Sequence, residues 1–413
     1  MRILHTSDWH LGRTFHGVDL LDDQRQALAH VADVVRDNDI DVVIVAGDVY
    51  DRSVPSADAV VVYDQALQAL RAAGATIVVT SGNHDSPTRL GVGSSFAAAG
   101  GLHLRTTIAD IDTPVVLADE YGPVAIYGIP YLEPEVARMD LGVPQARSHA
   151  DVLGAAMDRV RGHLAVHPAR SVVVAHAFVV GATASGSERC ISVGGVETVG
   201  AEVFSGVDYV ALGHLHSPQA VTDTVRYSGS PLPYSFGEAT HEKSVWLVEI
   251  DAQGAVEVSG VPIPQVRGLR SLTGTLDELL SAEQYTDAEG DYIDATLTDA
   301  VRPIDPMRRL RTRFPHAVTV AWRNPRADDL DDQRHRLRGR SDLDVVSAFV
   351  TDVRDAPSAR EIELIEGGLR AVVGEPEHVA SVPDTGNEAT EIVCEDGAFA
   401  LFALPDDDQR ESA

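Results

Sequence analysis

Short apolar runs in this sequence are repeatedly followed by side chains that can bind metal ions. Eight of these side chains are carboxylates, an amide or imidazoles: Asp8, His10, Asp48, Asn83, His84, His176, His214 and His216. Asp8 and His10 form an Asp-x-His pattern, and His214 and His216 form a Gly-His-x-His pattern. Alternate residues of an extended segment point the same way, so both members of each pair can reach one cluster. If the apolar runs are strands of an open α/β sheet, the loops at their carboxyl ends share one edge and the eight side chains can converge.

These residue types favour a pair of divalent cations. Carboxylates, an amide carbonyl and imidazoles suit hard-to-borderline ions, and the two cysteines, Cys190 and Cys394, lack metal-binding spacing. Two ions about 3.5–4 Å apart need a bridging ligand, which one carboxylate can supply, and Asp48 is our candidate. A single histidine at a strand end is more often a hydrogen-bonding residue than a metal ligand. The prediction therefore rests on five such segments together, each of which follows an apolar run. Such ions bind phosphate oxygens and stabilise the charge of an in-line displacement.

The segments that must position these side chains alternate between two patterns. β-Branched runs predict strands at residues 2–6, 41–46, 76–80, 124–129, 171–175 and 209–212. Amphipathic stretches predict helices at residues 22–37, 56–73 and 148–167. This alternation predicts an α/β fold with helices packed on sheet faces. Further strands are expected at 221–228 and 244–250, and the first domain, residues 1–265, closes after them.

Three further parts are expected beyond residue 265. Residues 269–322 predict a small α+β module. Its helices are expected at 276–282 and 306–314, and its strands at 292–297 and 317–322. Residues 341–373 predict two amphipathic helices, the second opened by a capping box of Ser358 and Glu361. Residues 374–413 hold eleven acidic residues and one arginine, so we expect a largely disordered acidic tail.

The charge of the chain restricts its partners without excluding nucleic acid. The 413 residues include 33 basic and 63 acidic ones, giving a net charge of −30, whereas a DNA-binding protein is expected to be basic. However, residues 302–340 hold eleven arginines against five acidic residues. We therefore expect weak, salt-sensitive DNA affinity for this chain alone. Lys243 is the only lysine among the basic residues, and this skew by itself indicates no function.

Cysteine usage and hydropathy indicate the compartment. Two distant cysteines do not suggest a disulfide scaffold. No run approaches the ~20 apolar residues that span a bilayer, and residues 1–10 do not resemble a signal segment. We therefore expect a cytoplasmic protein.

The order of the motifs resembles the calcineurin-like metallophosphoesterase superfamily: Asp-x-His, Gly-Asp, Gly-Asn-His-Asp, a strand-end histidine and Gly-His-x-His. Within it, the chain is similar to the nuclease subunits of bacterial SbcCD complexes, in the Mre-type nuclease family. Further matching stretches are residues 2–12, 187–189, 193–195, 227–232 and 305–310. The resemblance implies a metallophosphoesterase β-sandwich flanked by helices, with a small α+β capping domain over DNA and a C-terminal helical pair.

The resemblance also implies roles for single residues. One metal ion would be held by Asp8, His10, Asp48 and His216. The other would be held by Asp48, Asn83, His176 and His214. His84 would be an unliganded imidazole that orients the phosphate or protonates the leaving 3'-oxygen, a task for a group that titrates near neutral pH.

The activity and partners of the family follow from the same resemblance. Its members prefer manganese, with magnesium as the alternative, and cut DNA as a 3'-to-5' double-strand exonuclease and an endonuclease. They act in DNA replication, recombination and repair with an SbcC-type coiled-coil ATPase, as a homodimer within a heterotetramer. The helical pair 341–373 would then be the ATPase-docking segment.

One departure supplies an alternative function. Some family members carry a second histidine shortly after Gly-Asp, whereas this chain has Asp51 and Arg52 there, as protein phosphatases of the superfamily do. The alternative is therefore a metal-dependent phosphoprotein phosphatase. Those phosphatases have glutamate where this chain has Asp85, and they lack the capping module. A binding scaffold without activity is a third reading, but none of the expected metal ligands is missing.

Overall fold

The computed structural model describes residues 1–179, 181, 199–323, 340–353 and 356–373. The chain divides into two compact units, Met1–Asp328 and Asp329–Ala413. The matching stretches 187–189 and 193–195, residues 324–339 of the arginine-rich segment and the acidic tail lie outside the described residues. Among the described helices, none is long and apolar enough to cross a membrane.

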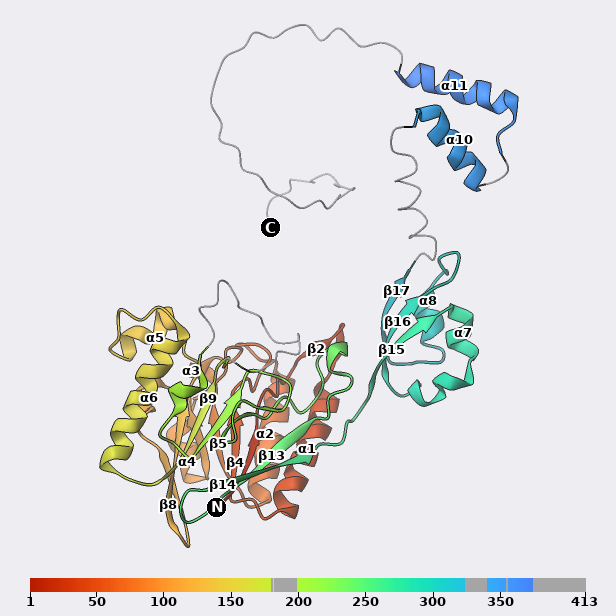
Figure 1. Ribbon diagram of the computed structural model, residues 1–413. Coiled ribbons are helices and arrows are strands. Elements are labelled where there is room, and N and C mark those ends of the chain that lie inside the picture. Colours follow the sequence, from red (N-terminus) through yellow and green to blue (C-terminus); the bar gives the residue numbers. More distant parts are fainter. Residues whose placement is uncertain (180, 182–198, 324–339, 354–355, 374–413) are drawn as a thin grey trace, which may run out of the picture. The chain divides into compact units, whose positions relative to one another are not determined.

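A six-stranded sheet with the order β14-β13-β1-β4-β5-β6 carries the first motifs (Figure 1). Its strands are β1 (Arg2–Thr6), β4 (Val42–Ala46), β5 (Thr76–Thr80), β6 (Leu102–Arg105), β13 (Ser244–Ile250) and β14 (Val256–Pro262). Strands β1, β4, β5 and β6 are parallel, and β13 and β14 run antiparallel to their neighbours. Every residue of β4 is buried, as expected for a parallel strand covered on both faces.

A second six-stranded sheet carries the later motifs, with the order β11-β12-β10-β9-β8-β7. Its strands are β7 (Val115–Asp119), β8 (Gly122–Ile129), β9 (Arg170–His176), β10 (Tyr209–Gly213), β11 (Gln219–Ala220) and β12 (Val225–Tyr227). The strand predicted over 221–228 is therefore largely wrong, because a turn occupies its first half. The Thr222 hydroxyl accepts a hydrogen bond from the Val225 amide at 3.1 Å, a local bond that competes with strand pairing.

The two sheets pack face to face and helices cover their outer faces. Buried residues of both sheets form one shared core, including Ile3, Ile44, Val174 and Ala211. Helices α1 (Leu21–Asp37) and α2 (Ala57–Ala72) pack on the first sheet, and α5 (Pro134–Asp140) and α6 (His149–Val166) on the second (Figure 1). The short elements between them are β2 (Thr14–Phe15), β3 (Val18–Asp19), α3 (Pro87–Leu90) and α4 (Ser94–Ala99). The predicted β-sandwich flanked by helices is confirmed.

A small parallel sheet follows, with the order β15-β16-β17. It consists of β15 (Leu269–Gly274), β16 (Tyr292–Leu297) and β17 (Ala317–Trp322), with helices α7 (Leu276–Ser281) and α8 (Pro306–Leu310). Helix α8 is shorter than the predicted 306–314, because Phe314 precedes a proline and such residues disfavour helical conformation. Strand β15 was not predicted. Tyr292 of this module donates a hydrogen bond from its hydroxyl to Asp23 of α1 at 2.8 Å.

The second unit contains two described helices that pack against each other, α10 (Asp342–Val353) and α11 (Ala359–Val373). The predicted capping box opens α11: the Glu361 amide donates to the Ser358 hydroxyl at 3.4 Å, and the Ser358 amide donates to the Glu361 carboxylate at 2.8 Å. Ser341 and Asp344 form the same arrangement at the start of α10. Local capping therefore sets both helix starts.

Candidate metal centre

The loops after β1 and β4 are joined by backbone hydrogen bonds. The Asp8 amide donates to the Gly47 carbonyl at 3.1 Å, and the His10 amide donates to the Asp48 carbonyl at 3.0 Å. These bonds hold the Asp-x-His segment beside Asp48. Strands β9 and β10 of the second sheet bring His176 and the 213–216 segment to the same place. The predicted convergence at the edge of a single sheet is thus corrected: the edges of two packed sheets supply the residues.

Two glycines allow these segments to approach one another. A Cβ atom on Gly213 would lie 1.9 Å from the Ala46 carbonyl oxygen, and one on Gly82 would lie 2.1 Å from Oδ1 of Asp48. Both separations are far below van der Waals contact, so only glycine fits at either position. The glycines that precede the motif residues therefore set how closely the strand ends meet.

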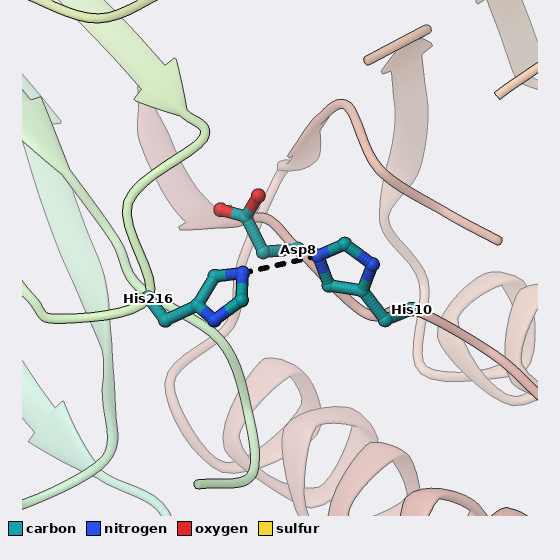
Figure 2. Close-up of side chains that lie close together, drawn as sticks. All are labelled: Asp8, His10 and His216. Atoms are coloured by element: carbon teal, nitrogen blue, oxygen red, sulfur yellow. Dashed lines mark hydrogen bonds between the residues drawn. The ribbon is translucent and has the colours of Figure 1, made fainter. Parts of the chain in front are cut away.

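Asp8, His10 and His216 form the first group of side chains (Figure 2). The Nε2 atoms of His10 and His216 lie 3.1 Å apart, and Figure 2 shows both rings converging beside the Asp8 carboxylate. That carboxylate accepts hydrogen bonds from the Ser7 hydroxyl at 2.5 Å and from the His214 amide at 3.0 and 3.1 Å. The group is buried and held from several directions.

Asp48 lies at the middle of the cluster. Its Oδ2 atom is 3.4 Å from Nε2 of His176, 3.5 Å from Nε2 of His10 and 3.9 Å from Nε2 of His84. Asp48 also belongs to both of the other groups that could hold a metal ion, one with His10 and His84 and one with Asp8 and His176. This central position suits a bridging carboxylate.

Asn83 and His214 complete the set at the side of the second sheet. The Asn83 side-chain oxygen lies 3.0 Å from Nε2 of His176 and 3.3 Å from Nδ1 of His214. All eight residues singled out in the sequence are therefore brought together. Geometry does not separate His84 from the ligands, because His84 belongs with His10 and Asp48 to a group that could hold a metal ion.

Backbone carbonyls orient two of the imidazoles. Nδ1 of His176 lies 3.0 Å from the Ala46 carbonyl oxygen, and Nδ1 of His84 lies 2.8 Å from that of Asp51. A carbonyl only accepts hydrogen bonds, so each Nδ1 carries the proton and each Nε2 faces the centre. Both rings thus present Nε2 toward Asp48.

Backbone strain is concentrated in this cluster. Seven non-glycine residues of the described part of the chain have positive φ, and four of them belong to the cluster: Asp8, His10, Asp48 and His214. Their φ angles are 53°, 45°, 48° and 112°. Such conformations cost about 1–3 kcal/mol each and persist where surrounding structure enforces them, often at functional sites.

The electrostatics of the cluster fit divalent cations. Burial and the neighbouring Asp48 raise the pKa of Asp8 to about 6. Burial lowers the pKa of His176, but the Asp48 charge and hydrogen bond outweigh it and raise this pKa to about 9. The neighbouring histidines hold the pKa of Asp48 well below its usual range despite its burial, so its negative charge is offset by a proton on His176 where no other cation neutralises it. Oxygen and imidazole donors without thiolates suit hard-to-borderline divalent cations, so the residues present fit a metal pair.

Several supporting residues were not assigned a role from the sequence. Asp85 accepts hydrogen bonds from the amides of Val49, Tyr50 and Gly82 at 3.1, 2.9 and 2.9 Å, which ties two motif loops together. Gln24 of α1 donates to the His10 carbonyl at 2.7 Å. Asp85 stands inside a recognisable motif and could have been found, whereas nothing in the helical pattern marks Gln24.

Comparisons with known proteins identify two families along the chain. Residues 1–218 match the calcineurin-like phosphoesterase family. Residues 265–354 match the SbcD C-terminal family, described as type 5 capsule protein repressor C-terminal domain.

Two solved structures are similar to part of the chain at low sequence identity. The protein TT1561 of Thermus thermophilus is 15% identical, with a TM-score of 0.37, over 63% of this chain and 98% of that chain. A dimetal phosphatase from Danio rerio is 11% identical, with a TM-score of 0.38, over 64% of this chain and 99% of that chain.

Proposed function

The chain belongs to the calcineurin-like phosphoesterase family, and we propose that it is a nuclease that hydrolyses DNA phosphodiester bonds with two divalent metal ions. The observation that carries the proposal is the succession of two family matches, a phosphoesterase domain and then an SbcD C-terminal domain. The proposed activities are 3'-to-5' double-strand exonuclease and endonuclease in DNA replication, recombination and repair. Manganese is the proposed ion.

The proposed ligands are those that the resemblance to the family implies, and all of them lie in the cluster. One ion is assigned to Asp8, His10, Asp48 and His216. The other is assigned to Asp48, Asn83, His176 and His214. When bound, the ions bind phosphate oxygens and stabilise the negative charge that develops during displacement. The central position of the Asp48 carboxylate, within 3.5 Å of His10 and His176, supports its assignment to both ions.

His84 is the proposed acid or orienting group. Its Nδ1 hydrogen bond to the Asp51 carbonyl aims Nε2 at the centre, 3.9 Å from Asp48 Oδ2. When the ring is protonated on both nitrogens, Nε2 can donate a hydrogen bond to a phosphate oxygen or a proton to the leaving 3'-oxygen. The buried ring has little freedom to turn away, which supports a positioned donor.

The proposed partner is an SbcC-type coiled-coil ATPase that binds the helical pair α10–α11. Phe349 and Leu364 on these helices have 66% and 63% of their surface exposed. Large exposed apolar side chains on a short helical pair are typical of a surface that packs on another chain. We also propose a homodimer within the complex and a DNA-capping role for the module of β15–β17.

A phosphoprotein phosphatase remains the second candidate, because of Asp51. Its Oδ1 atom lies 3.6 Å from Nδ1 of His10 and 3.7 Å from Nη1 of Arg13, so this carboxylate faces the cluster. The same superfamily motif, Gly-Asp-x-x-Asp-Arg, suggested this function from the sequence.

A comparison of two substrates tests the proposal. The full-length chain is incubated with manganese and an end-labelled duplex, and separately with a phosphoserine peptide, each with and without the ATPase partner. We expect manganese-dependent shortening of the duplex and little phosphate release from the peptide. Phosphate release from the peptide with intact duplex would instead establish the phosphatase. Asp33→Asn, an exposed carboxylate of α1, serves as the matched control and should behave as the wild type.

A further inference from the structure

Lys243, the only lysine of the chain, is buried next to the candidate metal centre. Its side chain has no exposed surface, and neither has that of Glu238, which accepts a hydrogen bond from Nζ at 2.5 Å. Charged side chains are rarely buried this completely unless they are paired. The other 32 basic residues are arginines, and among those that the structure describes only Arg170 is buried.

All three hydrogens of the Lys243 ammonium group have acceptors. Besides Glu238, Nζ donates to the His216 carbonyl at 2.8 Å and to the Ser230 hydroxyl at 3.0 Å. An ammonium group is a compact donor with three hydrogens, whereas a guanidinium is planar and larger. The site therefore suits lysine and not the arginine that the chain uses elsewhere.

The pair contacts His216 from two sides. Lys243 holds the His216 backbone carbonyl, while Oε1 of Glu238 lies 3.9 Å from Nδ1 of the His216 ring. The other ring nitrogen, Nε2, faces His10 in the metal centre at 3.1 Å. A carboxylate behind Nδ1 favours a proton on that nitrogen and leaves the Nε2 lone pair for a metal ion.

The loop that follows β12 packs directly on His216 as well. The Ser230 amide donates to the His216 carbonyl at 3.1 Å. Gly229 has φ of 75°, and a Cβ atom there would lie 2.7 Å from the same carbonyl oxygen. The backbone of His216 is therefore fixed by a loop that the Lys243 ammonium ties to the start of β13.

We propose that Glu238 and Lys243 are positioning residues that hold His216 as a metal ligand, with Nδ1 directed at Glu238 and Nε2 at the ion. This inference rests on the proposed function, since it requires His216 to bind a metal. Neither residue touches the substrate or the reacting atoms. Their effect is confined to the ion held by Asp8, His10, Asp48 and His216.

Manganese binding to the full-length chain tests the inference. Wild type, Glu238→Gln and the double variant Glu238→Leu with Lys243→Met are titrated with Mn²⁺ by calorimetry, and electron paramagnetic resonance separates paired from isolated ions. We expect one of the two ions to bind about 10–100-fold more weakly in both variants, as for lost partners of a ligating histidine. At intermediate manganese these variants should show isolated Mn²⁺ where the wild type shows a coupled pair.

Thermal unfolding separates positioning from a general structural role. Replacing both members of a buried ion pair by apolar residues is often neutral for stability, so the double variant should unfold near the wild-type temperature and still bind manganese weakly. Arg170→Met is the control, because Arg170 pairs with Asp119 at the opposite end of β9. It should lower the unfolding temperature without changing manganese affinity.

Two outcomes overturn different claims. If Glu238→Gln or the double variant binds two manganese ions as tightly as the wild type, Glu238 and Lys243 do not position His216, although the proposed function stands. If the wild type itself binds no pair of manganese ions, the proposed function fails first. Glu238→Gln keeps the shape of the side chain, and the double variant leaves no buried charge unpaired, so the inference is judged from whichever of the two keeps the wild-type unfolding temperature.

Discussion

Imidazole orientation decides what each histidine of the centre can do. His176 and His84 are oriented by the carbonyls of Ala46 and Asp51, and His216 has Glu238 behind its ring. The sequence motifs predicted which histidines converge. They could not predict these partners, because each partner lies far from its histidine along the chain and outside the motif that contains it. Residue types thus predict which side chains gather at the centre, and tertiary packing sets the tautomers.

His84→Gln tests the residue proposed as acid. We expect duplex cleavage to fall by about 10²–10⁴-fold, the usual contribution of a positioned acid or base, while manganese stoichiometry stays unchanged. Single-turnover cleavage and calorimetry measure the two effects. Loss of a bound ion would show instead that His84 is a ligand, and unchanged cleavage would remove its proposed role.

Close approach of the two sheets depends on glycine at the strand ends. Gly213 of β10 leaves no room for a Cβ atom beside the Ala46 carbonyl of β4. We expect Gly213→Ala to lower the free energy of unfolding by about 1–3 kcal/mol or more, as overpacking does, and to weaken manganese binding by separating Asp48 from the second sheet. Chemical denaturation and metal titration measure both.

Gly162→Ala is the matched control for this element. Gly162 lies within α6, and a Cβ atom there would meet nothing within 4 Å. Because glycine weakens a helix interior, this variant should gain about 0.5–1 kcal/mol of stability. A Gly213→Ala variant as stable and as metal-competent as the wild type would contradict the close-packing argument.

Asp119 joins the first residue to the second sheet. Its carboxylate accepts hydrogen bonds from Arg170 and from the Met1 ammonium, at 2.8 Å from the latter. The hydrogen bond from Arg170 holds the pKa of Asp119 well below its usual range, against the opposing effect of burial. A lowered carboxyl pKa means stability that is present above the unfolded value of about 3.9 and is lost as pH falls below it.

We therefore expect Asp119→Asn to lower the stability of the fold by an amount that depends on pH. At pH 7 we expect the free energy of unfolding to fall by about 1–3 kcal/mol, because Arg170 loses its charged partner. Wild type and variant should converge as pH is lowered below about 4. Urea titrations between neutral and acidic pH measure the difference. A constant difference across that range would show that the carboxylate charge is not the cause.

Elements with strong patterns were predictable, and those shaped by packing were not. Strands β1 and β5 match their β-branched runs to the residue, and α2 and α6 begin after the capping serines Ser56 and Ser148. Strand β15 was missed because its mixed sequence gains strand structure only by pairing with β16. Side-chain hydrogen bonds at Thr222 and a proline after Phe314 shortened two other elements.

At the scale of the whole molecule, the effective positive charge of residues 302–340 is smaller than its eleven arginines suggest. Within the described part of the capping module, Arg308 pairs with Asp305, Arg309 with Asp277 and Arg313 with Glu289, at 3.3, 3.0 and 3.0 Å. These ion pairs neutralise part of the positive charge that the proposed DNA-capping role would place against a polyanion. The net charge of −30 then predicts that the isolated chain binds duplex DNA with low affinity.

Deletion of residues 341–413 tests which part of the chain binds the ATPase and which part cleaves DNA. The truncated chain should fail to co-purify with the SbcC-type ATPase, because it lacks α10 and α11. It should keep manganese-dependent activity on short duplexes, because Met1–Asp328 forms a compact unit by itself. Affinity capture and a cleavage assay measure the two. Retained capture would place the ATPase-binding surface elsewhere.

We propose that one buried carboxylate, Asp48, would hold both metal ions of a DNA-hydrolysing centre. The most direct measurement is the manganese-dependent cleavage rate of a labelled duplex by the full-length wild type and by Asp48→Asn, with folding checked by circular dichroism. For this role of Asp48 we expect cleavage by the wild type that requires manganese, and a rate at least about 10³-fold lower for the folded variant, because transition-state stabilisation by both ions would be lost. Equal rates, or a wild type that leaves the duplex intact at every manganese concentration, would contradict it.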